Sequence, residues 1–194
     1  MTTLDHIVID VEIQNPIESL PNGWNDTDKM GIACAVVYEF LGDRFRVFGP
    51  EEQEELKERV MKADKITGFN IWKFDYQVIF GLPGHKRVEA LRDKTNDLLV
   101  NIWRNLGLRT DCFTGAHKGW NLDNICKATL GHSKIGNGAD APRWYQAGQL
   151  HRVINYCLDD VALERDLCKF MDEHKFVLHP TKPRVELTRP EWNP

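Results

Sequence analysis

Two acidic residues near the start of the chain have a spacing that suits metal chemistry. Asp10 and Glu12 follow the apolar run 7–9, which predicts a buried central strand. Strand side chains alternate between faces, so both carboxylates point the same way, roughly 7 Å apart along the strand. Carboxylate oxygens are ligands that suit Mg²⁺ or Mn²⁺. Two solvated acids at a strand end would show the same pattern, so this pair leaves both interpretations open.

A tyrosine and an aspartate form a second candidate pair near the other end of the chain. Tyr156 and Asp160 lie in the longest helical pattern, residues 150–175. Their i, i+4 spacing puts both side chains on one helix face. We expect that face to point into the core, because it continues through apolar residues, namely Leu163, Leu167 and Phe170. A phenol and a carboxylate there need polar partners, although a tyrosine bonded to a nearby acid at the core's edge would also explain them.

A third group of polar residues lies between these pairs. Asp75 begins a predicted helix over 72–80, directly after a short predicted strand at 65–70 that ends in Asn70. An acid in the first turn of a helix stabilises the helix dipole without any further role. Asp97, at another predicted strand end, has the same alternative explanation.

The remaining pattern predicts one α/β domain over residues 1–194 with a mixed β-sheet. Strands are expected first and helices later, with a polar loop at 132–148. The tail, about 176–194, is expected to be loop or an edge strand. The expected strands are 6–12, 31–40, 44–48 and 65–70, and the expected helices begin near 50 and cover 72–80, 121–130 and 150–175. Residues 96–106 are expected to be a strand end that runs into a helix.

Composition narrows the classes of function. The net charge of −4 argues against a protein that binds duplex DNA through a broad basic surface. The five cysteines are scattered and predict free thiols in a reducing cytoplasm. No apolar run approaches the ~20 residues of a membrane span, so we expect no membrane partner.

In chain order the three groups read Asp-x-Glu, Asn-x-x-x-Phe-Asp and Tyr-x-x-x-Asp. This order resembles the DEDD superfamily of DnaQ-like 3′–5′ exonucleases, which have a ribonuclease-H-like mixed sheet flanked by helices. The resemblance covers nearly the whole chain, and segments 68–79, 97–107 and 122–160 look like stand-alone bacterial and phage members. Tyr156 stands where the tyrosine subclass has its tyrosine, and Asn155 stands where the other subclass has a histidine.

The resemblance implies roles for particular residues. The family's metal ligands fall on Asp10, Glu12, Asp75 and Asp160, and Tyr156 would orient the attacking water. Positions that contact substrate in the family fall on Ile13, Asn70, Phe74 and Lys134. The family's usual Thr-Gly after the first acidic pair is replaced by Ile13-Gln14.

The implied activity is hydrolysis of a single-stranded DNA 3′ end with two Mg²⁺ or Mn²⁺ ions per site. Aromatic residues that could stack on bases are Phe69, Trp72, Phe74 and Trp144. RNA or short oligonucleotides are alternative substrates. A non-catalytic nucleic-acid-binding module on the same fold is an alternative of another class, and a subunit of a repair or replication complex is a further one.

Overall fold

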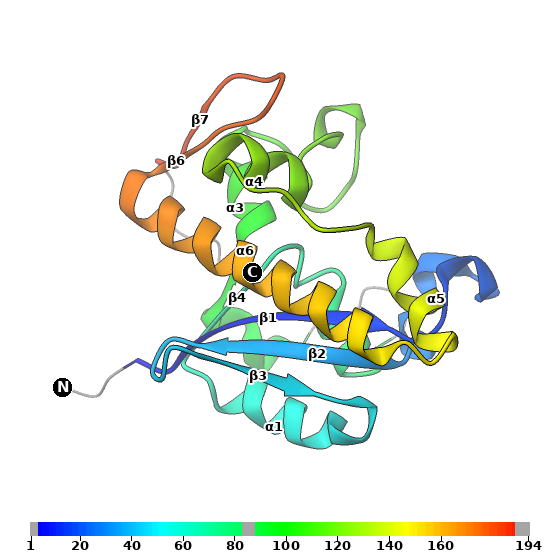
Figure 1. The fold of residues 1–194 in the computed structure, drawn as a ribbon. Coiled ribbons are helices and arrows are strands. Elements are labelled where there is room, and N and C mark those ends of the chain that lie inside the picture. Colours follow the sequence, from blue (N-terminus) through cyan, green and yellow to red (C-terminus); the bar gives the residue numbers. More distant parts are fainter. Residues whose placement is uncertain (1–3, 83–87, 189–194) are drawn as a thin grey trace.

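A computed structural model, which describes residues 4–82 and 88–188, shows an α/β fold built on a five-stranded sheet (Figure 1). The strands lie in the order β3-β2-β1-β4-β5. β2 is antiparallel to β1 and β3, whereas β4 is parallel to β1 and β5. This arrangement is that of the ribonuclease-H-like fold, as predicted. The strands are β1 His6–Ile13, β2 Ile32–Glu39, β3 Arg44–Phe48, β4 Lys65–Gly68 and β5 Thr95–Asp97.

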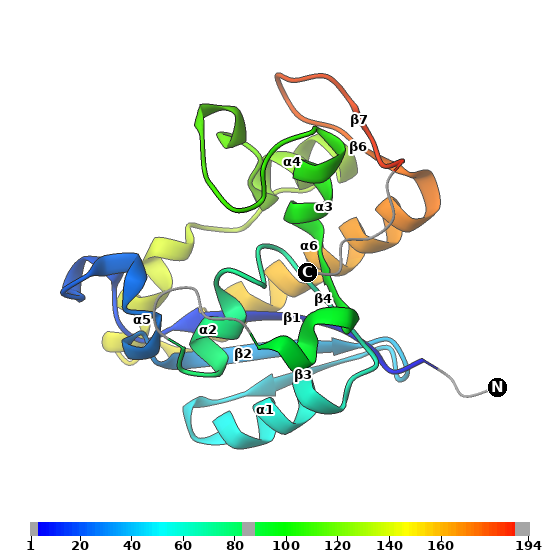
Figure 2. The same ribbon diagram turned by 180° about the vertical axis from the view of Figure 1, so that it is seen from behind.

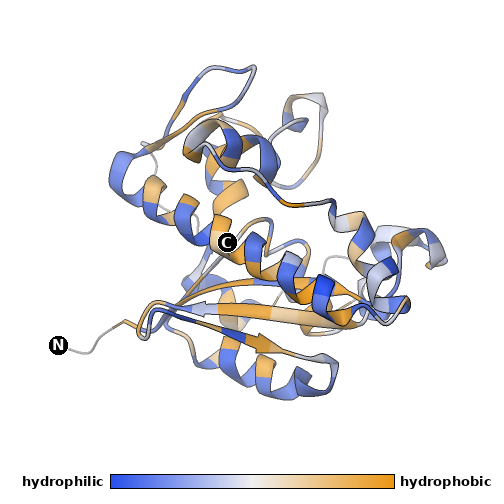
Figure 3. Ribbon diagram, viewed as in Figure 1, coloured by the Kyte–Doolittle hydropathy of each residue, from blue (hydrophilic) through white to orange (hydrophobic). Residues whose placement is uncertain are grey.

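Helices cover both faces of the sheet (Figure 2). Helices α1 (Gln53–Lys62) and α2 (Asp75–Ile79) pack on one face, and α5 (Ala141–Gln146) and α6 (Leu150–His174) on the other. Two more helices, α3 (Leu98–Asn105) and α4 (Leu122–Leu130), pack with the end of α6 in a separate apolar cluster. The central strands are mainly hydrophobic and α1 is mainly hydrophilic (Figure 3), as expected for a buried sheet under a surface helix.

Two sequence predictions differ from the structure. Residues 132–148 are not all loop, because α5 lies within them; Pro142 stands in its first turn, where a missing N–H costs nothing. The helix predicted over 72–80 begins only at Asp75, since Phe74 has a non-helical backbone.

The described part of the tail forms a separate two-stranded sheet, β6 (Phe176–Val177) with β7 (Val185–Glu186). Residues 189–194 of that predicted tail lie outside the described part.

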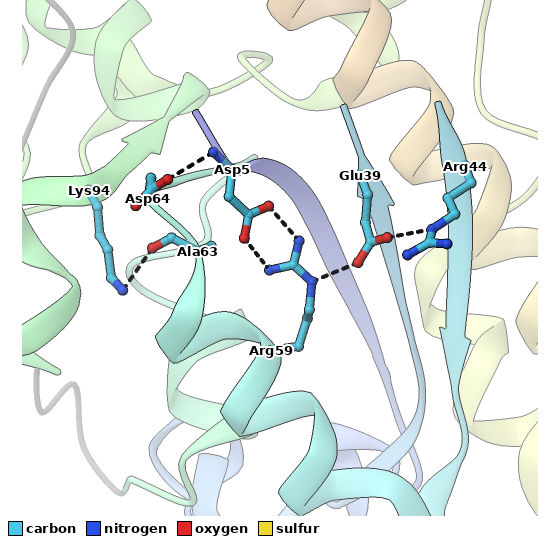
Figure 4. Close-up of polar contacts among 7 residues, drawn as sticks. All are labelled: Asp5, Glu39, Arg44, Arg59, Ala63, Asp64 and Lys94. Atoms are coloured by element: carbon cyan, nitrogen blue, oxygen red, sulfur yellow. Dashed lines mark hydrogen bonds and ion pairs between the residues drawn. The ribbon is translucent and has the colours of Figure 1, made fainter. Parts of the chain in front are cut away.

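An ion-pair network ties α1 to the sheet at the end where β1 begins (Figure 4). The Arg59 guanidinium donates to both carboxylate oxygens of Asp5, at 2.8 and 3.0 Å, and to Glu39 Oε1 at 2.7 Å. Arg44 Nε donates to Glu39 Oε2 at 2.6 Å. This network fixes the start of β1, at the opposite end of the strand from Asp10 and Glu12.

None of the described helices combines the length and the apolarity that crossing a membrane requires. Every cysteine is a free thiol, as predicted.

Candidate metal centre

Strand β1 presents its two acids to helix α6. Along β1, Ile7 and Ile9 pack in the cluster with α1 and α2, whereas Val8 packs in the cluster with α6. Side chains alternate along a strand, so Asp10 and Glu12 lie on the same face as Val8. The sheet therefore delivers both carboxylates to the face that α6 covers.

Helix α6 contributes the third carboxylate. Asp10, Glu12 and Asp160 each offer an oxygen atom, and these atoms all lie within 4.8 Å of one another. Glu12 is 7% exposed and Asp160 is 2% exposed. The Oδ1 atom of Asp160 is buried with no hydrogen-bond partner among the described residues. A compact set of carboxylate oxygens that includes an unpaired buried one fits a hard divalent cation.

Asp75, the fourth predicted ligand, lies beside this group. It is the first residue of α2, it is 2% exposed, and its Oδ1 accepts a hydrogen bond of 3.1 Å from the backbone N–H of Val11. That bond joins the start of α2 to β1 between Asp10 and Glu12. Asp75 is near enough for the charge of Asp10 to act on it, but it is not among the acids whose oxygens converge within 4.8 Å.

Crowding of the acids favours their protonated forms. Burial, with the nearby Asp160 adding to it, raises the pKa of Asp10 to about 7. Burial and the charge of Asp10 raise the pKa of Glu12 well above its usual value, and the pKa of Asp75 rises for the same reasons. A divalent cation would remove this repulsion and restore the ionised acids.

Lys134 supplies the positive charge at the cluster. Its Nζ forms an ion pair of 2.5 Å with Asp160 Oδ2 and lies 5.2 Å from the centre of the Tyr156 ring. Its backbone N–H donates to Asp123 Oδ1 at 2.8 Å, which fixes the loop that carries it to α4. The residue predicted to contact substrate therefore sits against a predicted metal ligand.

Tyr156 lies one turn before Asp160 and is 4% exposed. Its hydroxyl is buried and forms no hydrogen bond that meets ordinary geometry within the described residues. The ring packs edge-on against Trp144 of α5, with ring centres 6.0 Å apart. A side chain at Gly138 would come within 3.5 Å of the hydroxyl, so this glycine leaves the space in front of it open.

A groove with a volume of about 1010 Å³ lies beside the turn that leads into Asp75, and none of the four predicted metal ligands is among the described residues that line it. Asn70 and Phe74, two predicted substrate contacts, line its wall. Trp24, which packs edge-on against Phe74 at 5.9 Å, and Phe113 extend its aromatic lining; these two side chains are 60% and 66% exposed. The lining also includes Lys73 and Lys118.

The remaining residues predicted to contact substrate or to stack on bases are mostly packed against other side chains. Ile13 is 6% exposed, packs in the core on the α1 and α2 side, and does not line the groove. Of the candidate stacking residues, Trp72 is buried at the groove wall, Phe69 packs in the α3–α4 cluster and Trp144 packs on Tyr156.

Asp97 binds backbone N–H groups and is not one of the acids whose oxygens converge within 4.8 Å. It caps α3 by accepting from the backbone N–H groups of Leu99 and Val100, and it also accepts from those of Asn70 and Trp72. Burial raises the pKa of Asp97 to about 6, while these backbone bonds oppose the rise. Asp97 thereby holds the turn that leads into Asp75.

No sequence pattern singled out Glu164, a further buried acid on α6. It lies one turn after Asp160 on α6, is 1% exposed, and has an Oε2 atom without a hydrogen-bond partner in the described structure. The predicted core-facing stripe was only partly correct, because Leu167 is buried but Leu163 and Phe170 are only partly buried. Extending the i, i+4 spacing of Tyr156 and Asp160 by one more step would have found Glu164.

No protein-family model and no curated protein matches the chain. Among solved structures, the family B DNA polymerase from the hyperthermophilic archaeon Pyrobaculum calidifontis is similar, with a TM-score of 0.58 and 16% sequence identity. The match covers 87% of this chain but only 24% of the polymerase. At this identity the match shows a shared fold, and the chain spans about a quarter of the polymerase's length.

Proposed function

We propose that the protein is a metal-dependent 3′–5′ exonuclease that removes nucleotides from the 3′ end of single-stranded DNA. The observation that carries the proposal is the convergence of Asp10, Glu12 and Asp160 oxygens within 4.8 Å, at the end of the central strand of a ribonuclease-H-like sheet. Asp75 stands beside them. A fold shared with a DNA polymerase is in keeping with a nucleic-acid substrate.

Two Mg²⁺ or Mn²⁺ ions would be held by Asp10, Glu12, Asp75 and Asp160. When bound, such ions activate a water molecule and neutralise the charge that grows on the phosphoryl oxygens during hydrolysis. The protein's contribution is to hold four acids in place before the ions arrive.

Tyr156 is suited to orient the attacking water. Burial and the charge of Asp160 raise the pKa of Tyr156 above its usual value, so the phenol stays neutral at pH 7. A neutral phenol is a poor base, but its hydroxyl can both donate and accept a hydrogen bond. The hydroxyl lies close to Lys134 and Asp160 but forms no hydrogen bond of ordinary geometry within the described residues, which leaves it available to a water molecule.

Lys134 is suited to bind the phosphate that is cleaved. In the metal-free protein its ammonium group pairs with Asp160. Once cations neutralise Asp160, the same ammonium group can interact with a phosphoryl oxygen instead.

The groove supports a single strand as the substrate. Bases of any type can stack on the aromatic rings that line the groove, which belong to Trp24, Phe74 and Phe113. Lys73 and Lys118 place positive charge along the same wall for the phosphate backbone. The Asn70 amide, next to the start of α2, can hydrogen-bond to the terminal nucleotide.

The direct test is incubation of a 5′-labelled single strand with Mg²⁺, with Mn²⁺ or with chelator. We expect a descending ladder of products with either metal and none with chelator. A matched RNA strand decides between DNA and RNA, and a self-complementary duplex tests the preference for single strands. Internal fragments would indicate an endonuclease, and binding without cleavage would indicate a non-catalytic module.

A further inference from the structure

Helix α6 carries a second buried carboxylate, one turn beyond Asp160. Glu164 is 1% exposed, and its Oε2 atom is buried without a hydrogen-bond partner among the described residues. A carboxylate in such a place is costly unless a cation or a hydrogen-bond donor compensates it. Its unpaired oxygen is therefore a feature that the described side chains leave unexplained.

The groups around Glu164 are mostly acids. The carboxylate is near enough to Asp10, Asp75 and Asp160 for their charges to act on it, and the positive charge of Lys134 opposes theirs. Lys134 is already paired with Asp160. From α4, the neighbouring group is the thiol of Cys126, which is a weak donor. Glu164 is thus a buried acid on α6 that the charges of Asp10, Asp75 and Asp160 reach.

We propose that Glu164 is a fifth carboxylate of the divalent-metal centre, and that it positions the ion on the Asp10–Asp75 side by accepting hydrogen bonds from that ion's water. The proposal rests on the function proposed above. Glu164 is not among the acids whose oxygens converge within 4.8 Å, which is why it acts through water. Groups that support a metal's ligands in this way usually change its affinity by about 10- to 100-fold.

The charges of the centre agree with this role. When all groups are ionised, the net charge of the centre is four negative charges. Lys134 contributes one positive charge, and the five carboxylates contribute five negative ones: Asp10, Glu12, Asp75, Asp160 and Glu164. Two divalent cations would neutralise these charges. Without Glu164 the loaded centre would carry an excess positive charge before substrate binds.

The test measures metal binding alone, without a reaction. Glu164→Gln removes the charge and keeps the shape, and Glu173→Gln makes the same change on the same helix at a side chain that is 77% exposed. Each full-length protein is titrated with Mg²⁺ and Mn²⁺ by calorimetry, and its melting temperature is measured in chelator and in Mg²⁺. We expect the Glu164→Gln variant to bind at least one ion about 10-fold more weakly. We also expect it to melt higher than wild type in chelator, because one buried like charge is gone. The Glu173→Gln variant should match wild type in both measurements.

The outcomes separate this proposal from the function that it rests on. A wild-type protein that binds no divalent cation overturns both, whereas equal metal affinities of wild type and Glu164→Gln overturn only the role of Glu164. A Glu164→Gln variant that fails to fold is replaced by Glu164→Met, an apolar side chain of similar shape. If the Met variant binds metal as wild type does, Glu164 has a structural role only.

Discussion

At Asp10, burial and the neighbouring Asp160 both favour the protonated acid, which puts its pKa near 7, well above the value of 3.8 for an unperturbed aspartate. The folded, metal-free protein therefore binds this proton more tightly than the unfolded chain does. Such a group contributes stability while it is protonated, and that contribution is lost as the pH rises through the folded-state pKa. Glu12 and Asp75 shift in the same direction. The residues that suit the centre for metal thus weaken the empty protein at neutral pH.

The first prediction concerns this pH dependence. In chelator, the contribution of Asp10 to the free energy of unfolding should fall as the pH rises from about 4 to about 7. Saturating Mg²⁺ should remove that fall, because bound cations favour the ionised acids. Urea unfolding at several pH values, with and without Mg²⁺, measures the difference. If the free energy of unfolding depends on pH in the same way with and without Mg²⁺, the raised pKa of Asp10 is contradicted.

The second prediction concerns Asp10→Asn. This variant should lose cleavage on the order of 10³-fold or more, because it removes a metal ligand. It should melt higher than wild type in chelator, since the repulsion among the acids is reduced. Single-turnover cleavage and thermal unfolding measure the two effects. Full Mg²⁺-dependent cleavage by Asp10→Asn would remove Asp10 from the centre.

At the level of elements, most of what positions the centre could be predicted from local sequence. The apolar runs before Asp10 and in β2, and the helical pattern over 121–130, are short-range signals that the structure confirms. Helix α5 was missed because its starting proline lies within a glycine-rich, polar segment. The buried face of α6 was only partly correct, because several elements cover a 25-residue helix along different faces. The charges of Asp10, Asp75 and Asp160 act on Glu164, and the approach of residues so far apart in the sequence is a tertiary feature that no local pattern predicts.

The third prediction tests the turn before α2. Asp97→Ala removes the acceptor of four backbone N–H groups, and we expect a loss of about 2–4 kcal/mol of stability. Cleavage should also slow, because the turn from Asn70 to Asp75 loses its anchor. Urea unfolding and cleavage rates measure both effects. Asp93→Ala, at an exposed residue nearby, is the control and should change neither.

The fourth prediction tests the ion-pair network at the far end of β1. Arg59→Ala leaves Asp5 and Glu39 without their shared partner, with side chains 29% and 8% exposed. We expect a loss of about 2 kcal/mol, less than for a fully buried pair because solvent screens part of it. The cleavage rate of the folded variant should not change, since the network lies away from the acidic centre. A large drop in that rate would show that this network also shapes the centre.

Across the whole molecule, the groove joins segments that are far apart in the sequence. Its aromatic lining comes from the segment between β1 and β2, the turn before α2, and the segment between α3 and α4. Trp24 and Phe113 lie outside long regular elements, so no periodicity predicts that they share a wall. The net charge of −4 is consistent with a protein that binds nucleic acid in one groove instead of over a broad basic surface.

The fifth prediction concerns Trp24→Ala. The loss of one stacking ring should cost about 1–3 kcal/mol of strand binding, which appears as a KM about 10-fold higher with kcat nearly unchanged. The side chain is 60% exposed, so the fold should be unaffected. Leu41→Ala, at another exposed apolar residue in the β2–β3 turn, is the control. An unchanged KM would exclude Trp24 from the path of the strand.

The order of the elements along the chain has a consequence for synthesis in the cell. Asp10 and Glu12 emerge from the ribosome before the other strands of the main sheet, whereas Asp160 follows on α6, after every strand of that sheet has been made. A nascent chain therefore exposes the first two acids long before it can close a site around a cation. Translation itself delays the onset of any hydrolytic activity until the last long helix docks on the sheet.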